Sequence, residues 1–344
     1  MRIFSGIRPT GELHIGNYLG AIKQWLELQE KNECVFCVVD LHAITTPYDS
    51  EKLQKNILEL AAAYLAAGLQ PEKCIFFVQS QIKEHSELAW LLGTITPLGE
   101  LQRMTQFKEK SKKHPEYINA GLLNYPLLMA ADILLYQTDL VPVGRDQRQH
   151  VELTREIARK FNKKFGKVFV EPSCLLPKFG EKIMSLQNPK KKMSKSDNPA
   201  GCISLFEEPE VIQKKIAAAV TDTGKSVRYD PEKKPGISNL LTIYSLFTQA
   251  RQSRAKGEDE TLVSSTGGKS IKDLEKKFKS KGYAEFKKSL TELLINSLEP
   301  FRRKRKELIL REVYVKEILE QGKRRAQIIA QSTMQEVKKK MGLI

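Results

Sequence analysis

Apolar positions in the first half of the chain alternate between short continuous runs and longer stretches with helical spacing. The short β-rich runs predict strands at RIFSGI (2–7), CVFCVVD (34–40), CIFFVQS (74–80) and DLVPVG (139–144). Amphipathic helical stretches follow them at residues 18–31, 51–68, 85–95 and 146–161. Strands that alternate with long helices predict βαβ units, and therefore an α/β fold with a Rossmann-like, doubly wound parallel sheet.

A helix-rich stretch interrupts this alternation. From Glu84 to Tyr136 the helical signals continue without a strand signal, which predicts an insertion between the two halves of the sheet. We assign this helical connective insertion to roughly residues 47–124. The α/β domain as a whole is assigned to residues 1–204.

The pattern changes after Ser204, where strand signals disappear and apolar residues recur with a spacing near 3.6. This spacing therefore predicts a second, all-helical domain at residues 205–344. It contains the densest basic cluster, FRRKRK (301–306), followed by Lys316, Lys323, Arg324 and Arg325. A solvated helix face is the better interpretation for any one of these residues. For the cluster as a whole, contacts with phosphate groups are an equally good interpretation.

Composition indicates a class of partner. The 344 residues are 41% hydrophobic, which suits about two domains with ordinary cores. The formal net charge of +16 indicates a polyanionic partner, most plausibly nucleic acid, although a lysine-rich source organism would produce the same surplus. No secretory leader and no apolar run approaching 18 residues are found, so we expect a cytoplasmic protein that does not enter a membrane.

The cysteine pattern CVFC, formed by Cys34 and Cys37, raises the question of a metal or redox site. Both cysteines lie in a predicted strand, where residues three apart face opposite sides of the sheet. No second CxxC completes a zinc site. Buried structural thiols are the better interpretation, and no protein metal site is expected.

Two segments carry candidate chemistry. FSGIRPTGELHIGNYLG (4–20) predicts a strand, a turn and a helix start, an arrangement that places backbone N–H groups where an anion can bind. PKKKMSKSDNPAG (189–201) gathers four lysines and two serines between a proline and an Asn-Pro. The second segment is either a solvated basic loop or a loop whose cations close on a phosphate.

Together the two segments form a specific pair, HIGN (14–17) and KMSKS (192–196), and here the chain resembles the class I aminoacyl-tRNA synthetases. The resemblance to their bacterial tryptophan-specific branch continues through LGELQRMTQFKEKS (98–111), the segment from Asn124 to Asn162, and PGISNLL (235–241). It runs closely from Ile3 to about Leu241 and more loosely through the helical tail.

The resemblance implies a two-step reaction. Tryptophan and ATP form an adenylate with release of pyrophosphate, and tryptophan is then transferred to the 3′-terminal adenosine of tRNA(Trp). No general base is needed, because a carboxylate is already ionised at pH 7; the difficulty is the charge that builds on the triphosphate. Mg²⁺ bound with ATP and the catalytic lysines Lys192, Lys195 and Lys110 are expected to balance it. Lys190 and Lys191 match nothing as strict and are interpreted as solvated charge.

The same resemblance implies the ligand contacts. The predicted ATP-binding set comprises Arg8, Pro9, Thr10, Gly16, Asn17, Gly144, Arg145, Asp146, Ile183, Lys192, Met193, Ser194, Lys195 and Ser196. Within it, Ile183 is expected at the adenine, and the 144–146 segment at the ribose. Two positions depart from the family pattern: Arg8 stands where many bacterial members carry glutamine, and Arg145 where some carry glutamate.

Asp132 lies in MAADILLY (129–136), among apolar neighbours, and a buried carboxylate needs a partner. A lysine or a helix end is the ordinary partner, and the resemblance supplies the indole N–H of tryptophan. It also implies apolar walls from Phe4, Met129, Val141 and Val143. His42, Tyr125 and Gln147 are expected at the charged end of the amino acid. His85, His114 and His150 receive no role.

The resemblance further implies a homodimer and an anticodon-binding role for residues 205–344. Three alternatives compete with this interpretation. A tyrosine-specific synthetase would carry a different acidic residue and a different second motif. A small adenylyltransferase would be shorter and lack the basic helical domain. A catalytically inactive tRNA-binding relative is disfavoured by the intact Lys192, Lys195 and Asp132.

Overall fold

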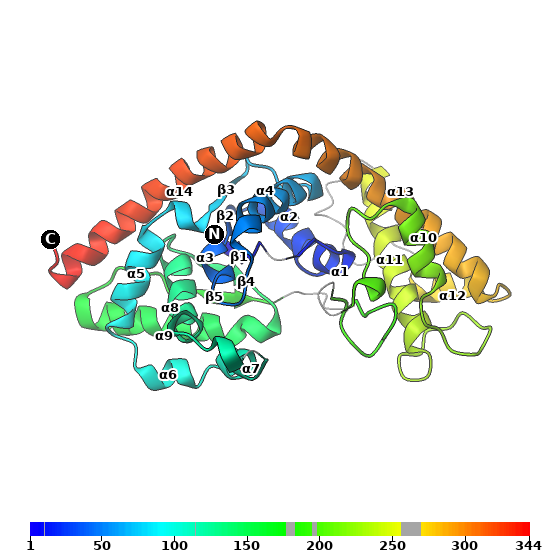
Figure 1. Cartoon of the computed structure of the whole chain (residues 1–344), viewed down its shortest axis with the longest axis horizontal. Coiled ribbons are helices and arrows are strands. Elements are labelled where there is room, and N and C mark those ends of the chain that lie inside the picture. Colours follow the sequence, from blue (N-terminus) through cyan, green and yellow to red (C-terminus); the bar gives the residue numbers. More distant parts are fainter. Residues whose placement is uncertain (10, 114, 177–182, 195–197, 256–269) are drawn as a thin grey trace.

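The computed structural model describes residues 1–9, 11–113, 115–176, 183–194, 198–255 and 270–344 (Figure 1). The sheet in this described part has five parallel strands in the order β3-β2-β1-β4-β5. Their bounds are β1 Arg2–Ile7, β2 Glu33–Val38, β3 Cys74–Val78, β4 Leu140–Pro142 and β5 Ser173–Leu175. The four predicted strands and the doubly wound α/β fold are confirmed, whereas β5 was not predicted.

The strand order reverses at β1. From β1 the chain adds β2 and β3 on one side, and it then returns to add β4 and β5 on the other side. The carboxyl ends of β1 and β4 therefore lie side by side with their connections diverging. In open α/β sheets, this switch point is where ligands bind.

Helices cover the sheet. The first βαβ units contain α1 (Ile15–Asn17), a π-helical turn (Tyr18–Ile22), α2 (Lys23–Gln29), α3 (Asp40–Ala43) and α4 (Ser50–Ala67). Helix α4 begins where the Asp49 side chain accepts a hydrogen bond from the Glu51 N–H, and it ends at Gly68, whose φ of 117° suits glycine.

The second group of helices follows β3. It comprises 3-10 turns at Gln79–Gln81 and Pro115–Tyr117, and helices α5 (Glu84–Gly93), α6 (Leu98–Gln102), α7 (Thr105–Lys113) and α8 (Ala120–Leu134). This agrees with the predicted helical stretch from Glu84 to Tyr136. The wider assignment of the insertion, 47–124, differs from the structure because it includes β3, a strand of the sheet.

Two buried clusters lie on the two faces of the sheet. Cys34 and Phe36 of β2 belong to one, and Val35 and Cys37 belong to the other. The two cysteines are therefore buried thiols on opposite faces, as the strand period predicts. The first cluster continues without a break into the helical part of the chain, through residues such as Ile237 and Phe286.

The remaining helices follow β4 and β5. After β4 come a 3-10 turn (Arg145–Gln147) and α9 (Arg148–Phe165); after β5 come a 3-10 turn (Pro199–Gly201), α10 (Pro209–Ala217), α11 (Pro235–Ala255), α12 (Ile271–Lys277), α13 (Tyr283–Leu310) and α14 (Glu312–Met341). Helices α10 and α11 pack on α13, and α12 packs on α11, while α13 also packs on α4. Among the helices described, none is long and apolar enough to cross a membrane.

Helix α14 departs from the predicted domain division. Figure 1 shows it leaving the end of α13 and running across α4, β3 and α5 of the α/β domain. Arg325 of α14 donates hydrogen bonds to the carbonyl oxygens of Pro71 and Cys74, and Thr333 donates one to that of Leu135. Residues 312–341 therefore pack with the α/β domain, although they follow the helical domain in sequence.

Candidate active site

A pocket of about 290 Å³ opens at the switch point between β1 and β4. All eight residues predicted to meet tryptophan line it: Phe4, His42, Tyr125, Met129, Asp132, Val141, Val143 and Gln147. Arg8 and Gly144 of the predicted ATP set line it as well. Residues far apart in sequence thus meet in one cavity, because β1, α3, α8 and β4 each bring part of the wall.

Asp132 on α8 is 1% exposed and is the buried carboxylate of this pocket. Its Oδ1 accepts hydrogen bonds from Gln79 Nε2 at 2.7 Å and from His85 Nδ1 at 2.6 Å, and its Oδ2 pairs with His42 Nε2 at 2.9 Å. Burial alone would raise the pKa of Asp132, but hydrogen bonds from His42 and His85 hold that pKa below its usual range. The side chain is therefore a carboxylate at neutral pH.

Histidines near the pocket have partners that the sequence did not suggest. His85 received no role, yet it is fully buried between Asp132 and the hydroxyl of Tyr136. His150, also without a predicted role, lies 2.7 Å through Nε2 from the hydroxyl of Tyr125. His42 was expected at the charged end of an amino acid, and in the structure its ring pairs with Asp132. A lone histidine in a helix carries no local sequence signal for such contacts.

The first motif forms a closed cap. The Asn17 N–H donates to His14 Nδ1, and the His14 N–H donates to Asn17 Oδ1, at 3.2 and 3.1 Å. Burial, and then the charge of Lys192, lower the pKa of His14 to about 4, so the ring is neutral at pH 7. A Cβ on Gly16 would lie 3.0 Å from Nδ1 of His14, which is tight, and 3.6 Å from Cβ of Ile183, an ordinary contact distance. The first motif therefore lies beside the segment that leads into the second.

Backbone pairing ties the second motif to the first. The Met193 N–H donates to the Ile183 carbonyl at 2.9 Å. The Ile15 N–H donates to the Ile203 carbonyl at 3.1 Å, and the Leu205 N–H donates to the Leu13 carbonyl at 2.8 Å. Met193 is buried, whereas Lys192 is exposed and close enough to His14 to influence its pKa. The stem of the basic loop is thus fixed against the helix start.

Some predicted residues cannot be placed around a ligand. Thr10, Lys195 and Ser196 lie outside the described residues. Lys110 falls on α7 and Arg145 on the turn before α9, and only their backbones are described. Pro9 lines a separate pocket of about 210 Å³, and Asp146 is exposed, accepting a hydrogen bond from Gln147 at 2.8 Å.

The basic cluster on α13 is partly structural. Arg302 is only 3% exposed, and its guanidinium donates to the carbonyl oxygens of Glu207 and Ile295 and to Glu299. Arg305 stacks over the Phe206 ring at 4.8 Å. Arg303 and Lys304 are exposed. Phosphate contact is therefore wrong for Arg302, and it stays a prediction for the exposed Arg303 and Lys304.

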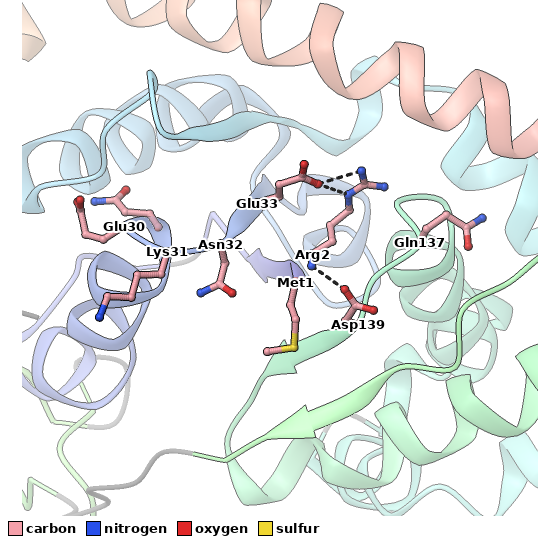
Figure 2. Close-up of a pocket in the computed structure, with 9 residues that line it drawn as sticks. Met1, Arg2, Glu30, Lys31, Asn32, Glu33, Gln137 and Asp139 are labelled. Carbon is pink, nitrogen blue, oxygen red and sulfur yellow. Dashed lines mark hydrogen bonds and ion pairs between the residues drawn. The ribbon is translucent and has the colours of Figure 1, made fainter.

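A third cavity lies at the amino ends of the strands, opposite the switch-point pocket (Figure 2). Figure 2 shows Arg2 paired with Glu33, while its backbone N–H donates to Asp139 at 2.7 Å. These contacts tie together the starts of β1, β2 and β4, so they serve the fold. Across the described residues, no three His, Cys, Asp or Glu side chains are grouped so that they could hold a metal ion.

Comparisons with known proteins define the class. Residues 1–299 match the family described as tRNA synthetases class I (W and Y). A tryptophan--tRNA ligase of Caldanaerobacter subterraneus is 51% identical over 344 residues, covering 100% of this chain and 98% of that protein. Together with the pocket at the switch point, these findings show that the chain belongs to the class I tRNA synthetases of the tryptophan and tyrosine family.

Solved structures support the same assignment. Tryptophanyl-tRNA synthetase from Mycoplasma pneumoniae has a TM-score of 0.84 at 39% identity, covering 99% of this chain and 97% of that chain. The enzyme from Campylobacter jejuni, complexed with ADP and tryptophan, has a TM-score of 0.83 at 37% identity, covering 99% of this chain and 100% of that one.

Proposed function

We propose that this chain is a tryptophan--tRNA ligase, which activates L-tryptophan with ATP and transfers it to tRNA(Trp) for protein synthesis. The observation that carries the proposal is the pocket at the switch point, where a buried carboxylate stands among apolar side chains. Relatives that share about half of the sequence over its full length carry the same activity in their names.

Tryptophan fits this pocket chemically. The apolar walls, including Phe4, Met129 and Val141, match the faces of an indole ring. Asp132, kept ionised by its partners, is an acceptor for the one N–H of that ring. Gln147, Tyr125 and Arg8 are candidates for the charged end of the amino acid.

ATP is proposed to lie beside the first motif. Gly16 has no side chain beside His14 and Ile183, so its backbone is open to close approach by a flat ring or a phosphate. Lys192 is exposed at this place, and Lys195 and Lys110 are proposed to join it on the triphosphate. Mg²⁺ is proposed to arrive with ATP and to neutralise part of its charge.

The chemistry of the first step then follows. The carboxylate of tryptophan attacks the α-phosphorus, the bond to the bridging oxygen breaks, and pyrophosphate leaves. No proton has to be removed, so the chain contributes orientation and positive charge. Cations fixed in advance lower the barrier, because charge grows on the leaving group in the transition state.

Three further assignments extend the proposal. The helical domain, α10 to α13, is proposed to bind the anticodon arm of tRNA while the acceptor end enters the α/β domain. A homodimer is proposed, supported by large apolar side chains left exposed near the insertion, such as Trp90 at 76%. A cytoplasmic location fits a protein that serves translation.

The test of the proposed function is exchange of radioactive pyrophosphate into ATP. Tryptophan alone among the amino acids should support this exchange, and tRNA is not needed. Asp132→Ala should weaken tryptophan use by about 10²-fold or more, the loss expected when a charged hydrogen-bonding group is removed from a buried site, with little change in the KM for ATP. Exchange supported by tyrosine, or no exchange with any amino acid, would refute the assignment.

A further inference from the structure

The two oxygens of the Asp132 carboxylate have different numbers of hydrogen-bond partners. Oδ1 accepts two hydrogen bonds, from Gln79 and His85, and Oδ2 has His42 as its partner among the described residues. Each carboxylate oxygen accepts about two hydrogen bonds. Oδ1 is therefore saturated by buried protein donors. The remaining acceptor position is on Oδ2, whose partner His42 is itself part of the pocket wall.

His85 is the most firmly held of these donors. It lies in the first turn of α5, is fully buried, and is hydrogen-bonded through both ring nitrogens. A neutral imidazole has one donor and one acceptor nitrogen. If Nδ1–H donates to Asp132 at 2.6 Å, Nε2 must accept from the Tyr136 hydroxyl, which is 2.8 Å away. The carboxylate of Asp132 can only accept, so it fixes Nδ1 as the donor, and the hydroxyl of Tyr136 holds the other side of the ring in place.

Tyr136 is itself fixed by aromatic packing. Its ring stacks on Phe4 with centroids 5.6 Å apart and an angle of 6° between the planes, and it meets Phe77 edge-on at 5.7 Å. Phe4 lines the pocket. The order of contacts is therefore Phe4, Tyr136, His85 and Asp132, and it begins and ends at the pocket wall.

We propose that His85, oriented by Tyr136, is a positioning residue that holds Oδ1 of Asp132 and thereby presents Oδ2 to the ring N–H of the ligand. The pair sets the preference for a ring that carries an N–H over an isosteric ring that does not. Neither residue lines the pocket, so their effect passes through Asp132. The inference rests on the proposed function and deepens it.

The experiment compares tryptophan with β-(3-benzothienyl)alanine, in which sulfur replaces the ring N–H. The readout is the ratio of kcat/KM for the two amino acids in pyrophosphate exchange. The ratio is independent of the folded fraction of each preparation, so a purely structural defect does not change it. The variants are His85→Leu, His85→Asn and Tyr136→Phe. Tyr64→Phe is the matched control, since Tyr64 is a buried tyrosine in the other core cluster.

His85→Leu should lower the ratio by about 10- to 100-fold, because it removes one charge-assisted hydrogen bond that orients the carboxylate. His85→Asn should keep the ratio within about threefold of the wild type, since its amide N–H replaces Nδ1–H. Tyr136→Phe should lower it by about 2- to 10-fold, the effect of a neutral hydrogen bond, and Tyr64→Phe should leave it unchanged.

The possible outcomes distinguish a failure of the proposed function from a failure of the positioning role of His85. If the wild-type chain does not use tryptophan, the proposed function fails. If the wild type prefers tryptophan and His85→Leu keeps that preference, the positioning role alone is overturned. If His85→Leu yields no folded protein, Tyr136→Phe decides: a ratio equal to that of Tyr64→Phe overturns the inference, and a lower ratio supports it.

Discussion

The hydrogen bond that His14 accepts at neutral pH is lost when its ring is protonated at lower pH. Its ring nitrogen Nδ1 must stay unprotonated to accept the Asn17 N–H, and the ring lies buried near the positive charge of Lys192. The folded state therefore resists a proton that the unfolded chain binds readily. A residue that closes the first motif at neutral pH becomes a source of instability at lower pH.

The pH dependence follows from the lowered pKa. The pKa of His14 is about 4 in the folded chain and 6.5 without the fold, so the unfolded state binds more protons between these values. Stability is lost as pH falls from about 6.5 toward 4, by about 2 kcal/mol at pH 5 for this one group. Urea unfolding at pH 7.5 and pH 5 measures the loss. His14→Asn keeps an N-cap acceptor but has no titrating ring, so its loss should be smaller by that amount.

Lys192 and Lys190 make a matched pair within one loop. Both are exposed, but only Lys192 belongs to the KMSKS motif and lies close enough to His14 to influence its pKa. Lys192→Ala should slow adenylate formation by about 10²- to 10³-fold with little change in tryptophan affinity, because its charge acts mainly in the transition state. Lys190→Ala should leave the rate within about twofold. Single-turnover kinetics and equilibrium binding separate rate from affinity; equal losses in both would contradict a transition-state role.

The residues of the site were predictable to different degrees. Asp132 and Gln147 lie in segments whose letters match a family pattern, so their presence around one ligand could be predicted, whereas Arg8 was predicted at ATP and lines the same cavity. The partners of Asp132 could not be predicted. Gln79 and His85 are 53 and 47 positions away from it, and no periodicity links a histidine in one helix to a carboxylate in another.

Among the elements, α14 approaches the sheet so closely that backbone meets backbone. A Cβ placed on Gly322 would overlap the carbonyl oxygen of Phe76 in β3. Only a residue without a side chain lets the helix touch the strand backbone there.

Gly322→Ala should therefore destabilise the chain by about 1–3 kcal/mol or more, although alanine favours a helix, because the backbone of β3 cannot yield. Gly99→Ala is the control, since a Cβ at that exposed position in α6 meets nothing within 4 Å. Denaturant midpoints of both variants test the contact. If the two variants were equally stable, α14 would not be pressed against β3 in solution.

The strength of each element's sequence signal explains which elements could be predicted. Strand β3 (CIFFV) and β2 after Glu33 (CVFCV) are continuous apolar runs, and such runs mark buried parallel strands, whereas β1 includes Arg2, Ser5 and Gly6 and has a weaker signal. Strand β5 spans only Ser173–Leu175 and directly follows Pro172, whereas the equally short β4 lies in the valine-containing segment DLVPVG, which carries a strand signal. The sequence of α14 shows an apolar stripe with helical spacing, but such a stripe does not identify the surface on which the helix packs. The residues buried there, such as Ala326 and Ala330, are small, and they suit close packing on a strand as well as on another helix.

For the whole molecule, the surplus of positive charge is the strongest indication of a polyanionic partner. Of 57 lysines and arginines, several on α13 and α14 are engaged within the protein, as Arg302 and Arg325 are. Net charge therefore overstates the number of cations available to RNA. Exposed cations such as Arg303 and Lys304 remain candidates.

Replacing Arg303 and Lys304 together by glutamine should flatten the dependence of log tRNA affinity on log salt by roughly 0.7–0.9 for each phosphate that is no longer neutralised. Tryptophan-dependent pyrophosphate exchange should be unchanged, because the first step needs no tRNA. A titration of tRNA binding at several salt concentrations gives the slope, and an unchanged slope would assign both residues to a solvated face. Arg302→Gln is the contrasting variant: it should reduce stability and leave the slope unaffected, since its guanidinium is buried.

The course of α14 also bears on how the chain is made. Synthesis proceeds from the amino terminus, and the α/β domain begins to fold while later residues are still on the ribosome. Ala326, Ala330, Met334 and Val337 complete one of its two cores, and α14 covers β3, an edge strand. Until the residues of α14 have left the ribosome, the edge of β3 presents unpaired backbone groups on which another nascent chain could add a strand. The first domain to appear is thus the last to be finished, and its exposed edge must be protected through the synthesis of the helical domain.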